Sequence, residues 1–177
     1  VAASAVAMQA VAASAVAMQA VAASAVAMQA VAASAVAMQA VAASAVAMLA
    51  ILQTETSRTA LMSANTVFQA VRAKMYETIS KPDSGWQKSR SQSADGVATL
   101  NATVASPLGF VFACLGYYSS ASASTTMLHP DGTSAAIARS AMKPQTMVSI
   151  DGVSFNGATF TEQGDGHAYA ELWTPKE

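Results

Sequence analysis

The stretch "VAASAVAMQA" at residues 1–10 recurs unchanged three more times, and a fifth copy at residues 41–50 ends in "VAMLA". The same ten-residue frame continues through residues 51–80, where Ile51, Leu61 and Val71 take the place of the first valine. A decapeptide array therefore covers residues 1–80, and its last three copies carry the charges that the first five lack.

The composition of the array favours helices. Ala, Met, Gln and Leu are strong helix formers, and neither Gly nor Pro occurs before Pro82. In residues 58–80 the apolar side chains follow a three–four spacing, which places them on one face of a helix. We predict a helix over about residues 58–80 that ends at Lys81-Pro82, because a residue before proline is disfavoured in helical conformation.

The identical copies leave two alternatives open. Ten residues at about 100° each fall roughly 80° short of three turns, so Val and Met would move around a continuous helix instead of forming one seam. Either the array is a helix that is apolar nearly all round and lies in a bundle, or the pentads "VAASA" and "VAMQA" form a β-solenoid with Val and Met inward. In both cases we expect one copy to be unable to bury its apolar side chains, so that identical chains associate, most simply as a parallel trimer.

Charge excludes some classes of function. Residues 1–54 carry no charged side chain and the net charge of the chain is −1, so there is no basic surplus for nucleic acid. The uncharged part is rich in Ala, Ser and Gln, and Leu, Ile and Phe are absent before Leu49. We therefore expect a soluble assembly with no membrane insertion.

After Pro82 the pattern changes to short β-branched or aromatic runs separated by turn residues. The turn dipeptides are Asp95-Gly96, Asp131-Gly132, Asp151-Gly152, Asn156-Gly157 and Asp165-Gly166. This predicts an α+β chain with a repeat shaft at residues 1–80, a linker at 81–85 and an antiparallel β-sandwich-like knob at 86–177. The expected core of the knob is Phe110, Phe112, Leu115, Ile150, Phe155, Phe160, Leu172 and Trp173.

Motifs for chemistry are few. Ser140 and Lys143 match a serine–lysine spacing without its companion motifs, and the two histidines, His129 and His167, have no spacing typical of a metal site. Cys114 lies in an apolar run, which is typical of a buried thiol. We expect no catalytic residues, no metal and no cofactor. Large rings suit recognition surfaces, so Tyr117, Tyr118 and Trp173 are the candidate receptor-binding residues.

The Ala/Val/Ser/Met decapeptides of residues 1–50, and in degenerate form residues 51–80, resemble the repeat shafts of tail-fibre and appendage proteins of tailed bacteriophages. The resemblance implies a non-enzymatic, homotrimeric virion fibre that is assembled in the host cytoplasm. It implies contacts with other virion proteins and a distal knob that binds a bacterial surface glycan or protein. The alternatives are an appendage tip that degrades polysaccharide and a bacterial adhesin.

Overall fold

The computed structural model describes the backbone of residues 4–95, 99–101, 109–117, 123–128, 134–139, 150–155, 159–163 and 166–177, and the side chains of 4–89, 109–112, 153 and 171–177. Two compact units are present: Val1–Trp86 together with Pro175–Glu177, and Gln87–Thr174. The first unit is built from helices and the second from antiparallel strands, so the α+β class is confirmed.

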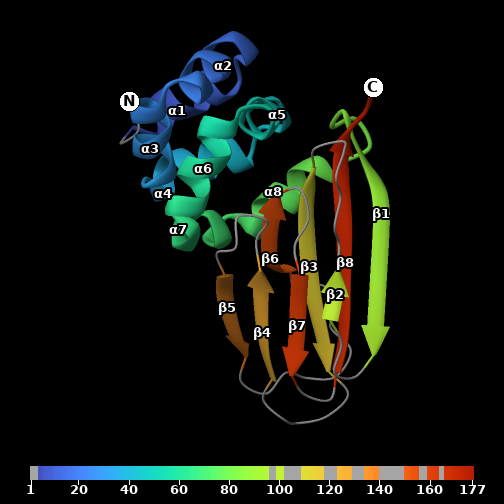
Figure 1. The fold of residues 1–177 in the computed structure, drawn as a ribbon. Coiled ribbons are helices and arrows are strands. Elements are labelled where there is room, and N and C mark those ends of the chain that lie inside the picture. The colour runs from blue at the N-terminus through green and yellow to red at the C-terminus, as the bar shows by residue number, and fades with distance from the viewer. Residues whose placement is uncertain are drawn as a thin grey trace. The chain divides into compact units, whose positions relative to one another are not determined.

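Within the described residues the first unit contains eight short helices, about one for each decapeptide (Figure 1). They are α1 Ala5–Ala12, α2 Ala15–Ala23, α3 Ala25–Ala32, α4 Ala35–Ala42, α5 Ala45–Gln53, α6 Glu55–Ser63, α7 Asn65–Ala70 and α8 Arg72–Ile79. The chain turns sharply between neighbours, by 103° from α1 to α2 and by 96° from α3 to α4. Helices three apart in sequence then pack together, α1 on α4, α2 on α5 and α3 on α6, so three decapeptides make one turn of a solenoid.

The serine at position 4 of the decapeptide breaks the helix every ten residues. Ser4, Ser14, Ser24, Ser34 and Ser44 are N-caps with extended backbone, and the Oγ of each accepts a hydrogen bond from the amide three residues later at 3.2–3.3 Å. A residue in extended conformation ends the preceding helix, and its hydroxyl stabilises the start of the next. The array is helical, but a continuous helix is wrong.

The methionine at position 8 fills the interior of each turn. Met8, Met18, Met28, Met38 and Met48 are all buried, and so are the alanines at position 2, Ala12, Ala22, Ala32 and Ala42. The two valines of the repeat differ, because Val41 is buried whereas Val6 points into solvent. The pentad β-solenoid is wrong, because the array is helical. Stacked turns of one chain cover the methionines, whereas Val6, Val16 and Val26 stay exposed.

Hydroxyl side chains join successive turns. Ser44 Oγ donates to the carbonyl oxygen of Ala12 at 2.5 Å, and Ser57 Oγ donates to that of Ala22 at 2.9 Å. In the same way Thr78 Oγ1 donates to the carbonyl oxygen of Ala42 at 2.7 Å. The acceptors lie at helix C-termini, where the last carbonyls have no partner within their own helix. These bonds therefore satisfy buried groups and fix the register between turns.

The single helix predicted for residues 58–80 is also wrong, since α6, α7 and α8 are separated by breaks at Ala64 and Val71. Its apolar positions are nevertheless buried, among them Leu61, Phe68 and Met75. The last helix ends at Ile79, and no helix runs through Pro82. Gly85, with φ of 78°, then makes the turn before the first strand, where a residue with a Cβ would be strained.

The second unit consists of antiparallel strands in two sheets, ordered β1-β8-β3-β6 and β2-β7-β4-β5 (Figure 1). The strands are β1 Trp86–Asp95, β2 Thr99–Asn101, β3 Phe110–Tyr117, β4 Ala123–Leu128, β5 Ser134–Arg139, β6 Ile150–Phe155, β7 Thr159–Gln163 and β8 Gly166–Pro175. Polar β1 was not expected from its sequence. The turn predicted at Asp151-Gly152 is wrong: the register of β3 and β6 shifts between Ala113 and Cys114, so this dipeptide forms an irregularity inside β6.

Side chains are described for four residues of the predicted core of this unit, and the prediction is confirmed for three of them. Phe110, Phe112 and Leu172 are buried, whereas Trp173 is half-buried. Gly109 fits tightly beside them, since a Cβ there would lie 2.6 Å from both Leu172 Cδ1 and the Trp173 carbonyl oxygen. The side chains of the other predicted core residues, Leu115, Ile150, Phe155 and Phe160, lie outside the described set.

Candidate functional site

The three predicted receptor-binding aromatics have different surroundings. Tyr118 lies outside the described residues, and Tyr117 is described only as backbone at the end of β3, opposite Gly166. Trp173 lies at the other end of the same strand pair, opposite Phe110. At about 3.3 Å per residue the Cα positions of Tyr117 and Trp173 are roughly 23 Å apart, so the strand pair does not bring these two residues together.

Trp173 belongs to a polar cluster with Glu171 and Lys88. Its indole Nε1–H donates to Glu171 Oε2 at 2.7 Å, and Lys88 Nζ lies 3.3 Å from Glu171 Oε1. Residues two apart on a strand share a face, which places the tryptophan and the carboxylate side by side on β8. Glu171 is only 7% exposed, so its charge needs these two partners.

This cluster holds the ring of Trp173 in one orientation while part of it stays exposed. On the neighbouring positions of β1 and β8, the hydroxyls of Ser89 and Thr174 form a further hydrogen bond. An exposed aromatic surface framed by a carboxylate and an ammonium group suits a polar, hydroxyl-rich ligand. The sequence predicted the tryptophan but missed Glu171 and Lys88; the alternation of Glu171 with Trp173 was the available signal.

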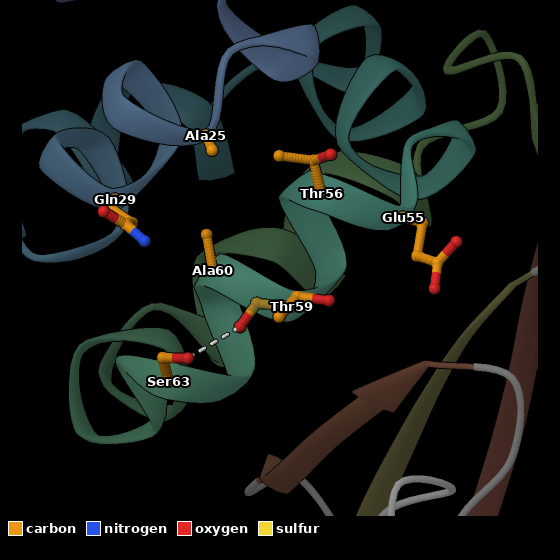
Figure 2. A pocket seen from close by; sticks show the side chains of 7 residues that line it. All are labelled: Ala25, Gln29, Glu55, Thr56, Thr59, Ala60 and Ser63. Atoms are coloured by element: carbon orange, nitrogen blue, oxygen red, sulfur yellow. Dashed lines mark hydrogen bonds between the residues drawn. The ribbon is translucent and has the colours of Figure 1, made fainter.

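A groove lies between α3 and α6 of the first unit (Figure 2). It encloses about 330 Å³ and is lined by Ala25, Gln29, Glu55, Thr56, Thr59, Ala60 and Ser63. Ser63 Oγ donates to the Thr59 carbonyl oxygen at 3.0 Å, and Figure 2 shows Glu55 at the opposite end from Gln29. The groove is lined by the amide of Gln29, the carboxylate of Glu55 and three hydroxyl side chains, so its walls offer hydrogen bonds.

Other predicted chemistry lies mostly outside the described set. Ser140, Lys143 and His129 fall in undescribed segments, and His167 and Cys114 are described only as backbone, in β8 and β3. The described residues contain no group of three or more His, Cys, Asp or Glu side chains that could hold a metal ion. None of their helices alone is long and apolar enough to cross a membrane, although the bent pairs α1–α2 and α3–α4 reach that length and apolarity together.

Comparison with known protein families and with curated proteins found no match.

Proposed function

We propose that this chain is a structural and attachment protein of a bacteriophage virion, in which the decapeptide array is a shaft and the β unit is the knob that attaches to the host surface. The observation that carries the proposal is the three-decapeptide turn. Because α4 packs on α1 as α5 packs on α2, the same interface recurs along the array, and each added turn lengthens the array by repeating this interface. Such an array suits a spacer.

Attachment is assigned to the β unit through Trp173. Its ring is partly exposed and its orientation is fixed by Glu171, so binding a ligand there costs little side-chain entropy. The proposed ligand is a bacterial surface glycan or protein, and a glycan fits the polar frame best. Association into a homotrimer is part of the proposal, because several weak sites on one fibre bind a surface far more tightly than one.

The experiment measures retention of the full chain on purified lipopolysaccharide and capsular polysaccharide, and on whole bacterial cells. We expect Trp173→Ala to reduce retention at least about tenfold, which corresponds to about 1.4 kcal/mol. Trp173→Phe keeps an aromatic ring but removes the indole N–H that bonds to Glu171. This variant therefore shows whether retention depends on the ring itself or on its hydrogen bond to the cluster. The matched control is Tyr76→Ala in α8, an aromatic-to-alanine change in the other unit, which is expected to leave retention unchanged.

Thermal unfolding of each variant distinguishes loss of binding from loss of fold. A Trp173→Ala variant that melts like the parent chain and still binds glycans and cells equally well would overturn the assignment of Trp173. Shortened glycan products in the same incubations would contradict a binding-only function and favour a polysaccharide-degrading tip. Sedimentation at micromolar concentration tests the trimer, and a monomer there removes it from the proposal.

A further inference from the structure

In the first turn of the solenoid, α1 to α3, some side chains are exposed whose equivalents in α4 to α6 are covered by the preceding turn, the alanines almost fully and the valines in part. Val6, Val16 and Val26 at position 6 are 77–79% exposed, whereas Val36 and Val46 at the same position are 42% and 41% exposed. Since these decapeptides are identical apart from Leu49, sequence does not explain the difference. What differs is that α4 and α5 each pack on a preceding helix of the array.

The alanines at position 10 show the same contrast more strongly. Ala10, Ala20 and Ala30 are exposed in the first turn. Their equivalents Ala40, Ala50 and Ala60 are only 4–7% exposed, because α4, α5 and α6 pack on α1, α2 and α3. Positions 6 and 10 therefore mark the side of each turn that faces the preceding turn. We call the first-turn copies of these residues the N-terminal face: Val6, Val16, Val26, Ala10, Ala20 and Ala30.

Hydrogen-bonding groups on this face follow the same pattern. Ser44 Oγ accepts from the Ala47 amide and also donates to the carbonyl oxygen of Ala12 in the turn before. Ser14 and Ser24 make the same cap bond, but no acceptor for their hydroxyl hydrogens occurs among the described residues. The first turn therefore has serine hydroxyls at positions equivalent to Ser44, which donates to the preceding turn.

The other end of the array is finished differently. Its last helices carry charged side chains, and Lys74, Glu77 and Lys81 form exposed ion pairs on and just after α8. Terminal repeats of solenoids need a polar outer surface to be soluble, because the interface that they would otherwise use is left open. The last three decapeptides carry charged side chains, whereas the N-terminal face consists of valine and alanine only.

From these contrasts we infer that the N-terminal face is a docking surface for a further helical turn made of three decapeptides of the same kind. This turn would present its position-2 carbonyl oxygens to Ser4, Ser14 and Ser24, as Ala12 does to Ser44. The added turn would cover the valines and alanines of the N-terminal face, just as α1 to α3 cover the equivalent residues of α4 to α6. The inference concerns the array alone and does not depend on the proposed function.

The test uses the full chain and a fluorescein-labelled synthetic peptide of three VAASAVAMQA units, and binding is followed by fluorescence anisotropy. We expect saturable binding that the triple variant Val6→Lys, Val16→Lys, Val26→Lys weakens at least about tenfold, since each lysine would have to be desolvated. The control places three lysines at exposed position 9 of decapeptides in the same array, as Gln9→Lys, Gln19→Lys, Gln39→Lys. It is expected to stay within about twofold of the parent chain.

A second measurement keeps the test decisive if the free peptide does not fold. Three decapeptides are joined before Val1, and the melting temperature of this chain is expected to exceed that of the parent, because one more turn-to-turn interface forms. Absence of peptide binding together with an unchanged melting temperature would overturn the inference. Two other outcomes, each without peptide binding, would also overturn the inference. If the parent chain dimerised and the lysine variant did not, the face would bind a second copy of the chain. If the parent chain bound phosphatidylglycerol vesicles, the face would bind lipid.

Discussion

The identical decapeptides and the diversified ones build the same solenoid by different means. In α1 to α5 the start of each helix is stabilised by a serine cap, whereas α6, α7 and α8 have no side-chain cap bond. The diversified helices instead contribute long-range contacts, with Ser57 and Thr78 bonded to the preceding turn and Phe68 in the interior. Helix starts are thus specified locally in the first part and through packing in the second.

This difference determines what each part can specify. Because the first decapeptides have the same sequence, any of them fits any place in the early turns, and the number of turns is free to vary. A diversified decapeptide carries residues suited to one place only, such as Thr78 opposite Ala42. The diversified decapeptides therefore determine where the array stops, and the number of identical decapeptides determines how long the array is.

The largest expected effect comes from a deletion that changes the phase of the repeat. Removing residues 31–35 takes away one pentad, including the cap Ser34, and prevents α4 to α6 from stacking on α1 to α3 in register. We expect the cooperative unfolding transition of the array to be lost, which circular dichroism at 222 nm during heating would show.

The control removes residues 31–40, a whole decapeptide. The remaining copies keep the same sequence and the same neighbours, so this chain should unfold cooperatively with only a modest loss of stability. If the two deletions behaved alike, the true repeat unit would be five residues, and the assignment of one helix to each ten-residue repeat would be wrong.

A smaller effect is expected for the interior of the diversified part. Phe68 is 0% exposed, and Phe68→Ala should lower the free energy of unfolding by about 3–5 kcal/mol through lost burial and a residual cavity. The comparison is Val26→Ala at an exposed valine, which should change the free energy of unfolding by less than about 0.5 kcal/mol. Urea titrations of both variants give the values, and equal losses would mean that position 8 of this decapeptide does not line the interior.

The serine caps offer a finer comparison within the identical part. Ser24→Ala removes a cap bond only and should cost about 1 kcal/mol. Ser44→Ala removes the cap bond and also leaves the Ala12 carbonyl without its donor, so the cost should rise to about 2–4 kcal/mol. Equal costs in urea titrations would show that the bond between turns contributes nothing.

The sequence was sufficient for features that depend on local preference. It predicted the ten-residue frame, helices in the array, antiparallel strands after Pro82, and burial of Phe110, Phe112 and Leu172. It failed where a residue acts through a distant neighbour. The bond from Ser44 to the Ala12 carbonyl, 32 residues away, cannot be seen in one decapeptide. The local cap bonds, and hence the helix break at each serine, were also missed from the sequence. A ten-residue serine spacing ahead of Ala-Val-Ala was the signal for repeated caps.

The candidate site shows the same limit. Trp173 was predicted as a large ring in a strand, and Glu171 follows from strand alternation. Lys88 lies 83 residues earlier in the chain, so only the pairing order of β1 beside β8 brings its ammonium group to the carboxylate. The separation of Tyr117 from Trp173 also depends on strand register, which the apolar pattern of β3 does not determine.

The smallest expected effect concerns the charges that finish the array. A hydrogen bond from Lys74, and then the positive charges of Lys74 and Lys81, lower the pKa of Glu77, whose side chain is exposed. A lowered pKa in the folded state means that the ion pairs stabilise the array above the unfolded-state pKa of about 4.3 and that this gain disappears as pH falls through the folded-state value. Glu77 also lies in the last turn of α8, where the helix dipole disfavours an anion, so the two effects oppose each other. Glu77→Gln should therefore change the melting temperature at pH 7 only slightly, and the two chains should melt together near pH 3. A difference that persisted unchanged at pH 3 would show that Glu77 acts through packing and not through its charge.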